Sequence, residues 1–538
     1  MRRFRNEKKR LWVVLLFIVL FAQVIMLIIA GQNKQGYFVD ELWGYGLANS
    51  YYHPHVYSDD AFNRGYLSPE YFKSYLEVSE EDAFKYGSVF YNQSQDAHPP
   101  LFYCVLHTIS SIFLDTFSKW FGIIPNIIYF IITAICLYVV AKKIIKNCYI
   151  ALIPVILWGF STQTVSYTIL IRMYMMFAMF VMMNVLVHSS YLQDNNEWTR
   201  KRYAVLILVN IGGFLTQYYY YIFAFFLSLF TVGIMSFRRQ WKQLVIYSSV
   251  MLISVAAAIF IFPGIINTFL TNRGAEAVNN LMSDKSWLDG FVQYWENIMD
   301  KVLYGTNKAF IALAVIGGGL FIWFGIRNNL ETKLKDIIKK INWLLPSLLF
   351  VSFFYMVLII KIAPFVVDRY YYPIVSIFWI AVVYFAVAGM RNLKHGTTAI
   401  SVLLITLGVV SGYQGYGANK IMYLFPNQAE NMKRIKNFEG SSCIYITDGR
   451  EYTTVVHSLE FQNFSEIKVI DVSKKSLQES EIHKKTENVI VYIDERMNQQ
   501  ETISQVMEKT GCTQYAELGR GSGVWWEDSE EIYIYAFR

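Results

Sequence analysis

The chain has 538 residues, a length that would fill roughly three or four soluble domains, but its composition points elsewhere. Apolar residues (AVILMFWYC) make up 54% of it and charged residues (DEKR) only 17%, against roughly 25% charged in a typical soluble protein. So much apolar sequence excludes a soluble enzyme, a nucleic-acid-binding domain and a disordered chain. The formal net charge of +7 is then better explained by basic cytoplasmic loops of a membrane protein.

Apolar runs close to the length that a membrane-spanning helix needs, about 20 residues, recur along the chain. We expect about eleven spans, at 11–30, 122–141, 149–166, 167–191, 203–218, 219–237, 243–263, 308–326, 342–360, 371–390 and 396–416.

Basic residues gather in alternate gaps between these runs. The first group lies before Leu11, and the others are Lys142, Lys143, Lys146, Arg200, Lys201, Arg202, Arg238, Arg239, Lys242, Arg327, Lys333, Lys335, Lys339, Lys340, Arg391 and Lys394. Because basic residues are enriched on the cytoplasmic side, the pattern predicts a multi-pass protein of the cell (plasma) membrane. Its N-terminus is expected in the cytoplasm and its C-terminus outside.

The apolar stretch 99–114 would break this alternation if it spanned the membrane, because it would place the Lys142 cluster outside. We therefore predict that it lies on the outer leaflet or dips into it. Residues 32–121 then form one long external loop of a transmembrane domain covering 1–418.

The composition changes from about Asn419 onward. Short runs rich in β-branched and aromatic residues, at 443–447, 467–472, 489–493 and 531–536, alternate with polar, helix-compatible segments at 449–462 and 498–510. The sequence thus predicts a small extracytoplasmic α/β domain at 419–538. Gly519–Gly523 is interpreted as a hairpin or loop, and no Gly-rich phosphate loop supports a nucleotide cofactor.

An acidic pair, Asp40–Glu41, follows directly after the first apolar run. Such a pair could be a solvated helix end, but here it is set in apolar and aromatic sequence. Neighbouring residues on a helix point in different directions, so we expect the two to divide labour. One would act as a general base and the other would orient it or hold a polar group.

The external loop ends in Asp96-Ala-His98-Pro99-Pro100. Mechanically, the two prolines stop the loop and start the next helix. The functional interpretation adds that Asp96 and His98 are held at the membrane surface, facing the acidic pair.

Three cations lie near predicted outer helix ends: Arg172, Lys361 and Arg369. Arg369 could simply pair with the neighbouring Asp368. Cations that converge on one outer face nevertheless suit a phosphate-bearing substrate, because arginine forms bidentate hydrogen bonds to phosphate oxygens. Gln217 and the tyrosines beside it fit an aromatic belt at the membrane interface or the lining of a polar site.

Four motifs in this order resemble the membrane-integral GT-C glycosyltransferases, in particular family-39-like enzymes, the lipid A aminoarabinose transferase and protein O-mannosyltransferases. They are Val39-Asp-Glu-Leu, Asp96-Ala-His-Pro-Pro-Leu-Phe-Tyr, Ile171-Arg-Met-Tyr and Arg369-Tyr-Tyr-Tyr-Pro. The resemblance covers about residues 1–415. The chain departs from it in having Gln217 where related enzymes often have histidine, and its C-terminal domain matches no motif of the family.

The resemblance implies inverting transfer of a sugar from a polyprenyl-phosphate donor to an extracytoplasmic acceptor, which is a cell-envelope glycan, a lipid or a protein. Asp40 would be the catalytic base and Glu41 its support. The substrate-binding residues would be Asp96, His98, Arg172, Tyr174, Gln217, Tyr218, Lys361, Arg369 and Tyr370. The implied partners are the lipid-linked donor, the acceptor and the bilayer, without nucleic acid. No cofactor is implied, and the need for a divalent metal stays open.

The main alternative is a transporter or a flippase of lipid-linked sugars. Transporters usually concentrate polar residues near the bilayer midplane, on broken helices in two corresponding halves. Here the charged candidates gather at one face and no halves correspond, so we favour the transferase. A structural or receptor role, with the C-terminal domain as the binding module, ranks third.

Overall fold

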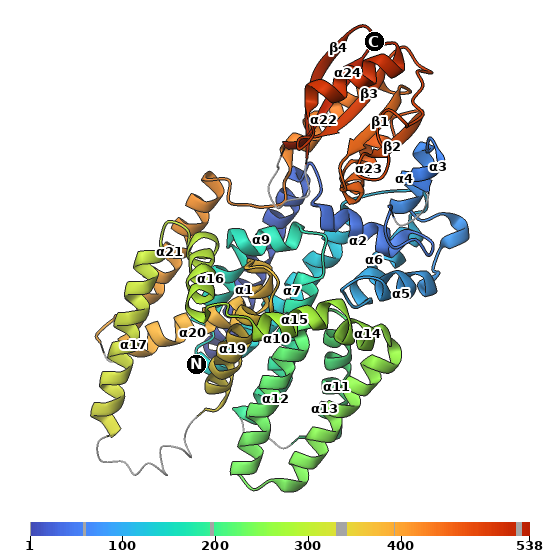
Figure 1. The fold of residues 1–538 in the computed structure, drawn as a ribbon. Helices are drawn as coiled ribbons and strands as arrows, with labels where there is room; N and C mark the ends of the chain where they lie inside the picture. Colours follow the sequence, from blue (N-terminus) through green and yellow to red (C-terminus); the bar gives the residue numbers. More distant parts are fainter. Residues whose placement is uncertain (1, 58–60, 194–197, 330–341, 392, 523–529) are drawn as a thin grey trace.

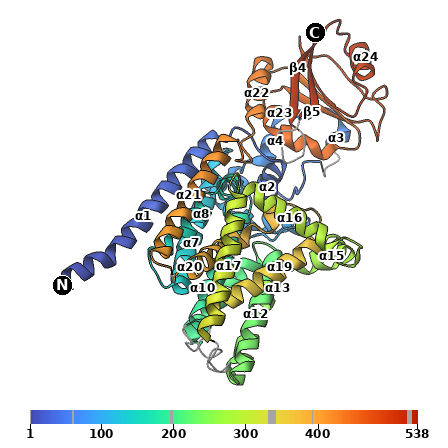
Figure 2. The same ribbon diagram turned by 90° about the vertical axis from the view of Figure 1, so that its left-hand side faces the viewer.

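The computed structural model describes residues 2–57, 61–193, 198–329, 342–391, 393–522 and 530–538. A bundle of helices carries a small α/β domain at one end (Figure 1). Helix α1 (Arg2–Asn33) lies at the edge of the bundle, and its N-terminal part extends away from the other helices (Figure 2). Only 17% of an 18-residue apolar stretch of this helix is buried within the protein, as expected of a helix whose side chains meet lipid.

Eight helices within the described ranges are long and apolar enough to cross a membrane. Besides α1, they are α7 (Trp120–Ile145), α10 (Tyr174–Leu192), α12 (Tyr219–Phe237), α13 (Trp241–Ile261), α19 (Leu344–Ile362), α20 (Tyr372–Met390) and α21 (Gly396–Gly417). Each overlaps one of the predicted spans. The predicted class, an α-helical multi-pass membrane protein, is therefore confirmed.

The other three predicted spans correspond to the helices α8 (Leu152–Gly159), α9 (Thr162–Ile169), α11 (Arg200–Phe214) and α17 (Asn307–Asn329). The run 149–166 is not one straight helix, because Ser161 caps a new helix by accepting a hydrogen bond from the Thr164 amide. Helix α11 has 15 residues, or about 22 Å of length. The total of eleven spans stays a prediction, and the predicted basic cluster at 333–340 lies outside the described residues.

Short helices form the end of the bundle that lies nearer the α/β domain (Figure 1). In the loop between α1 and α7 they are α2 (Val39–Asn49), α3 (Ala61–Arg64), α4 (Pro69–Leu76), η1 (Glu80–Asp82), α5 (Tyr86–Ser94) and α6 (Leu101–Ile112); between α13 and α17 they are α14 (Gly264–Leu270), α15 (Asn272–Met282) and α16 (Trp287–Lys301). With 12 residues, α6 is about 18 Å long and too short to cross a hydrocarbon core of about 30 Å. The stretch 99–114 thus forms no full span, as predicted.

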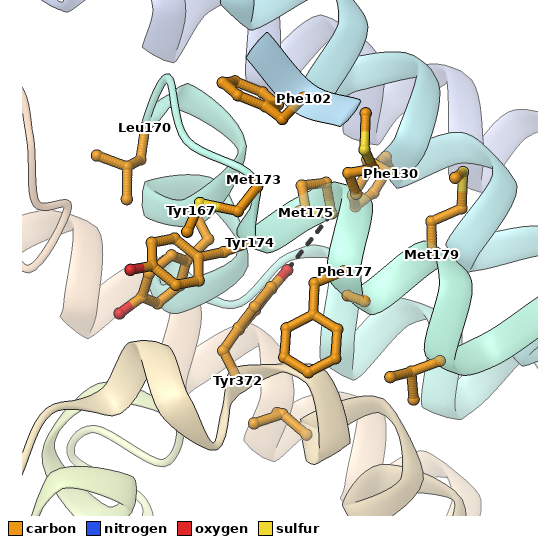
Figure 3. Packing of buried hydrophobic residues seen from close by; sticks show 14 of the residues in the cluster. Phe102, Phe130, Tyr167, Leu170, Met173, Tyr174, Met175, Phe177, Met179 and Tyr372 are labelled. Atoms are coloured by element: carbon orange, nitrogen blue, oxygen red, sulfur yellow. Dashed lines mark hydrogen bonds between the residues drawn. The ribbon is translucent and has the colours of Figure 1, made fainter. Parts of the chain in front are cut away.

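The core next to these short helices is built around the first turns of α10. Met175 and Phe177 of α10 pack near Phe102 of α6 and Phe130 of α7, while Tyr372 approaches from the start of α20 (Figure 3). The Tyr372 hydroxyl lies 3.7 Å from the Met175 sulfur. This packing fixes the N-terminal end of α10 relative to α6 and α20.

The C-terminal domain contains one five-stranded sheet in the order β2-β1-β3-β5-β4. Its elements are α22 (Pro426–Ile435), η3 (Lys436–Phe438), β1 (Ser442–Thr447), η4 (Glu451–His457), α23 (Ser458–Phe461), β2 (Glu466–Asp471), β3 (Val489–Asp494), α24 (Gln499–Thr510), β4 (Tyr515–Ser522) and β5 (Glu530–Phe537). β1 pairs in parallel with both β2 and β3, and β5 pairs antiparallel with β3 and β4. The predicted α/β class is confirmed; β4 is an additional strand that forms a hairpin with β5 over part of the glycine-rich segment.

The sheet is covered on both faces. Ile444 and Ile446 of β1 pack with Ile503 and Val506 of α24 in a core of their own, whereas Tyr445 belongs to the core shared with the rest of the protein. Alternate residues of a strand point to opposite faces, so this split follows from the strand geometry.

The domain docks on the loop between α1 and α7 through the edge of its sheet. Leu67 and Ile467 exchange two backbone hydrogen bonds of 2.7 and 2.8 Å, and Phe72 of α4 contacts Phe461 of α23 edge-on. The exposed edge of β2 is thus covered at this point by another part of the chain, as sheet edges usually need.

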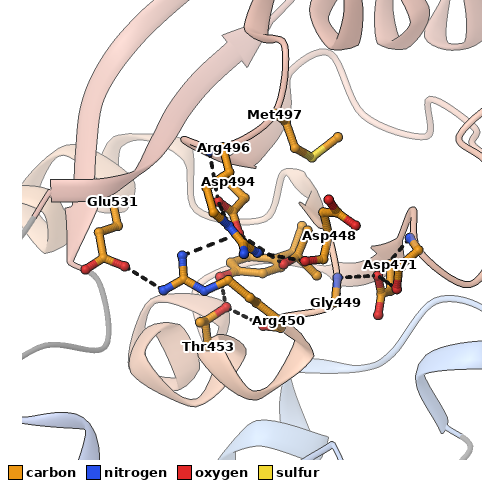
Figure 4. Close-up of polar contacts among 12 residues, drawn as sticks. Asp448, Gly449, Arg450, Thr453, Asp471, Asp494, Arg496, Met497 and Glu531 are labelled. Atoms are coloured by element: carbon orange, nitrogen blue, oxygen red, sulfur yellow. Dashed lines mark hydrogen bonds and ion pairs between the residues drawn. The ribbon is translucent and has the colours of Figure 1, made fainter.

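A charged cluster closes the carboxyl ends of the parallel strands (Figure 4). Asp494, which is fully buried, accepts from Arg496 and lies 3.7 Å from a guanidinium nitrogen of Arg450. Arg450 also bonds Glu531 of β5 at 2.7 Å. These ion pairs fix the start of η4, the element by which the domain contacts α2.

Candidate active site

A cavity of about 560 Å³ lies between α2, the end of the α1–α7 loop, the α11–α12 turn, α14–α15 and the turn before α20. Nine of the eleven residues predicted for the site line it. They are Asp40, Asp96, His98, Arg172, Tyr174, Gln217, Tyr218, Arg369 and Tyr370. Residues more than 300 positions apart in the sequence therefore share one chamber.

Asp40 stands in the first turn of α2, with its side chain about a fifth exposed to the cavity. Its carboxylate lies 2.9 Å from the guanidinium of Arg369. The positive end of the helix dipole also favours a negative charge at this position. The carboxylate is thus held in one orientation by Arg369 and lies within reach of a bound molecule.

Glu41 points away from the cavity and is fully buried. Its carboxylate accepts hydrogen bonds from Lys34 Nζ at 2.9 Å, from the Phe38 amide at 2.7 Å and from the Ile171 amide at 2.7 Å. The bond to Phe38 belongs to the capping box that starts α2. Glu41 therefore joins the end of α1, the start of α2 and the turn that carries Arg172.

Arg172 lies in the turn between α9 and α10, not inside a helix as the predicted span 167–191 implied. The helical pattern stops because buried side chains take its backbone bonds. Glu41 accepts from the Ile171 amide, and Asn126 donates to the Leu170 carbonyl at 2.7 Å. The guanidinium then reaches the Asp40 carbonyl at 3.0 Å.

Asp96 and His98 form a dyad on the cavity wall. The Asp96 carboxylate lies 2.8 Å from His98 Nδ1, and Arg172 lies 3.4 Å from the same ring. Burial lowers the pKa of His98, with Asp96 partly opposing that effect. Burial alone would raise the pKa of Asp96, but the attraction of His98 and Arg172 brings it below its usual value.

Arg369 lies in η2 (Asp368–Tyr370), between the rings of Tyr174 and Tyr370 at 6.0 and 5.5 Å from their centroids. Its charged partner in the cavity is Asp40. Asp368, the alternative partner considered from the sequence, is buried and bonds Lys301 at 3.1 Å. Neighbours in the sequence are thus directed to different sides.

Lys361 and Glu41 are the two predicted residues that do not line the cavity. Lys361 Nζ donates to the backbone carbonyls of Ser283 and Lys285, at 3.2 and 2.6 Å. It therefore ties the end of α19 to the turn between α15 and α16. Of the three cations expected to converge, Arg172 and Arg369 line the cavity and Lys361 does not.

Sequence reasoning missed several lining residues: Trp43, Tyr57, Arg273 and Glu276. Arg273 and Glu276 bond each other at 2.8 Å on one face of α15, and their spacing of three residues, which places two side chains on the same helix face, was the available signal. Among the described residues, no group of three or more His, Cys, Asp or Glu side chains is arranged to hold a metal ion.

Residues 97–263 match a family model described as dolichyl-phosphate-mannose-protein mannosyltransferase. The chain shares its fold with the crystal structure of ArnT from Cupriavidus metallidurans bound to undecaprenyl phosphate, at 11% identity and a TM-score of 0.53, with 98% of both chains covered. The apo structure of the same protein gives 12% identity and a TM-score of 0.46 over 99% of this chain and 98% of that one. No curated protein matches the sequence. The similarity to GT-C glycosyltransferases inferred from the motifs is confirmed.

Proposed function

We propose that this protein transfers a sugar, with inversion, from a polyprenyl-phosphate donor to an acceptor at the outer face of the cell membrane. The observation that carries the proposal is the pairing of Asp40 with Arg369 inside a cavity that also holds Arg172. A base for a hydroxyl group and two cations for a phosphate are what this chemistry requires. The fold shared with a protein crystallised with undecaprenyl phosphate gives independent support.

In the transfer step, the acceptor hydroxyl oxygen attacks the anomeric carbon of the sugar while its proton passes to the Asp40 carboxylate. The bond between that carbon and the phosphate oxygen breaks, and its electron pair leaves with the polyprenyl phosphate. Arg369 and Arg172 stabilise the negative charge that gathers on the phosphate. Arg369 binds Asp40 at 2.9 Å, and an incoming phosphate would share that guanidinium.

The other lining residues suit a sugar and its lipid. Tyr174 and Tyr370, which flank Arg369, together with Tyr218 offer ring faces and hydroxyls to a sugar. Gln217 adds an amide at the α11–α12 turn. His98, held in one orientation by Asp96, would contact substrate through its remaining ring nitrogen.

The proposed orientation places the cavity and the C-terminal domain outside the cell. Cysteines introduced at exposed Ser476 and Lys394, in a background with Cys104 and Cys148 replaced by serine, test it. A membrane-impermeant thiol reagent added to sealed cells should label Ser476→Cys and not Lys394→Cys. The opposite pattern would place the cavity on the cytoplasmic side and contradict transfer from a polyprenyl-phosphate donor at the outer face.

A transporter or flippase would use the same cavity without forming a covalent product. Purified protein should therefore be incubated with radiolabelled synthetic polyprenyl-phosphate hexoses and pentoses and a cell-envelope fraction as the source of acceptor. Label that enters the envelope fraction together with stoichiometric free polyprenyl phosphate supports the transferase. Movement of intact donor across proteoliposomes without cleavage would support the transporter.

A further inference from the structure

The segment between α1 and α2 is held by the segment that leads into the C-terminal domain. The amides of Gln35 and Gly36 both donate to the Leu424 carbonyl, at 2.7 and 3.2 Å. Lys34 Nζ donates to the Tyr423 carbonyl at 2.7 Å. These contacts, together with those of Gln428, join residues 34–37 to 423–428, and we name the pair of segments the clamp.

Gln428 closes the clamp with two hydrogen bonds to a single residue. Its side-chain oxygen accepts from the Tyr37 amide at 2.8 Å, and its side-chain nitrogen donates to the Tyr37 carbonyl at 2.8 Å. A side-chain amide that satisfies both backbone groups of a residue replaces the partner strand that the segment lacks. The backbone is thereby fixed three residues before Asp40.

The two segments approach so closely that the clamp needs a glycine. A Cβ atom on Gly36 would lie 2.4 Å from the Gln428 side-chain oxygen and 2.6 Å from the Phe425 Cβ. Rings add to the contact, since Phe38 packs against Tyr423 at 5.8 Å between centroids. Residues 34–37 and 423–428 are therefore closely packed against each other.

The far side of α22 is attached to the sheet. Asn431 donates to the Arg520 carbonyl, and Arg434 donates to the Leu518 carbonyl at 3.0 Å. A continuous path of contacts thus runs from β4 through α22 and Gln428 to the first turn of α2.

From these contacts we infer that Gln428 is a positioning residue for Asp40, and that the C-terminal domain completes the catalytic site through the clamp. The expected effect on turnover rests on the proposed function, whereas the positioning of Asp40 rests on the hydrogen bonds alone. It gives the C-terminal domain a task besides any role in acceptor binding. Since a displacement of about 1 Å in a catalytic group can cost about a hundredfold in rate, a loosened entry to α2 should reduce turnover without weakening donor binding.

Gln428→Ala is the main test, with Lys433→Ala as the matched control on an exposed position of the same helix. We expect kcat for release of polyprenyl phosphate to fall about 10- to 100-fold in Gln428→Ala, with KM nearly unchanged. Gln428→Glu should recover part of the loss, because its oxygens accept from the Tyr37 amide but cannot donate to the Tyr37 carbonyl. Equal rates in Gln428→Ala and Lys433→Ala would overturn the inference.

A double-mutant cycle separates positioning from general stability. If Gln428 acts through the Asp40 carboxylate, adding Gln428→Ala to Asp40→Asn should cause little further loss. Fully multiplicative losses would mean that Gln428 acts on something else.

Hydrogen–deuterium exchange tests the clamp without reference to the reaction. Amides of α2 should exchange faster in Gln428→Ala than in Lys433→Ala, while those of α7 and α10 stay protected. Unchanged exchange in α2 would overturn the positioning role even in a protein that proved inactive as a transferase. If the wild-type protein catalyses no transfer but Gln428→Ala shows the predicted change in exchange, the proposed function is overturned and the positioning role of the clamp is supported.

Discussion

Replacing Asp40 by asparagine tests the proposed chemistry most directly. Asparagine has almost the same shape, and its side-chain oxygen can still accept from Arg369, which lies 2.9 Å from the aspartate in the native protein. The substitution leaves Glu41 and the capping box of α2 untouched. What it removes is the negative charge and the ability to take a proton.

The size of the effect follows from that single loss. A general base contributes on the order of 10²- to 10⁴-fold in rate, so transfer should slow at least about a hundredfold, or about 2.7 kcal/mol in activation free energy. Binding of the donor should be unchanged or tighter, because Arg369 no longer shares its charge with an aspartate. We therefore expect kcat to fall and KM to stay or decrease.

Release of free polyprenyl phosphate from a radiolabelled synthetic donor, measured under single-turnover conditions, reports the chemical step. Binding of the donor to the same variant is measured separately by filtration. An Asp40→Asn protein that transfers sugar at a near wild-type rate would remove the base from the mechanism. A variant that fails to bind donor would instead show that the carboxylate organises the site.

Three further outcomes are expected. Arg369→Ala should lower kcat/KM strongly while the protein stays folded, and Arg369→Lys should recover only part of it, because lysine lacks the paired donors of arginine; full activity in the alanine variant would refute a role at the phosphate. Glu41→Gln should destabilise the protein by about 3 kcal/mol or more, since it leaves the buried Lys34 without its ion-pair partner, and should lower the apparent Tm in detergent more than Asp40→Asn does; equal Tm values would contradict this. Asp96→Asn removes a carboxylate that raises the pKa of His98, so any acid limb of the pH–rate profile set by that ring should move to lower pH; a shift to higher pH would refute the assignment.

The membrane class and the α/β domain could be predicted from the sequence because each rests on a periodic or compositional signal that extends over many residues. The strand β4 was missed because glycines are depleted in strands. The glycines of β4 lie where its pairing with β5 is irregular. The pairing with β5 shifts register between Glu517 and Gly519 and again between Gly521 and Ser522. Gly519 adopts a φ of +145°, a conformation that favours glycine at such a bulge.

The residues that line the cavity were predicted better than the contacts among them. Motif order and topology placed Asp40 and Arg369 on the same outer face, but nothing in the sequence pairs two residues that are 329 positions apart. Lys361 and Arg273 illustrate the limit in another way. Both lie at helix ends near the cavity, and which of them faces it depends on helix rotation and tertiary packing, which local sequence does not encode.

The clamp has a consequence for how the protein is made. A chain is synthesised and inserted from its N-terminus, so α1 and Asp40 are present while nearly all of the remaining helices are still to come. Tyr37 and its partner Gln428 are 391 residues apart, and contacts of such long sequence separation form late. The Asp40 carboxylate therefore reaches its final position only after α21 has been inserted and the chain beyond it has emerged, so an incomplete polypeptide held in the membrane still lacks the clamp.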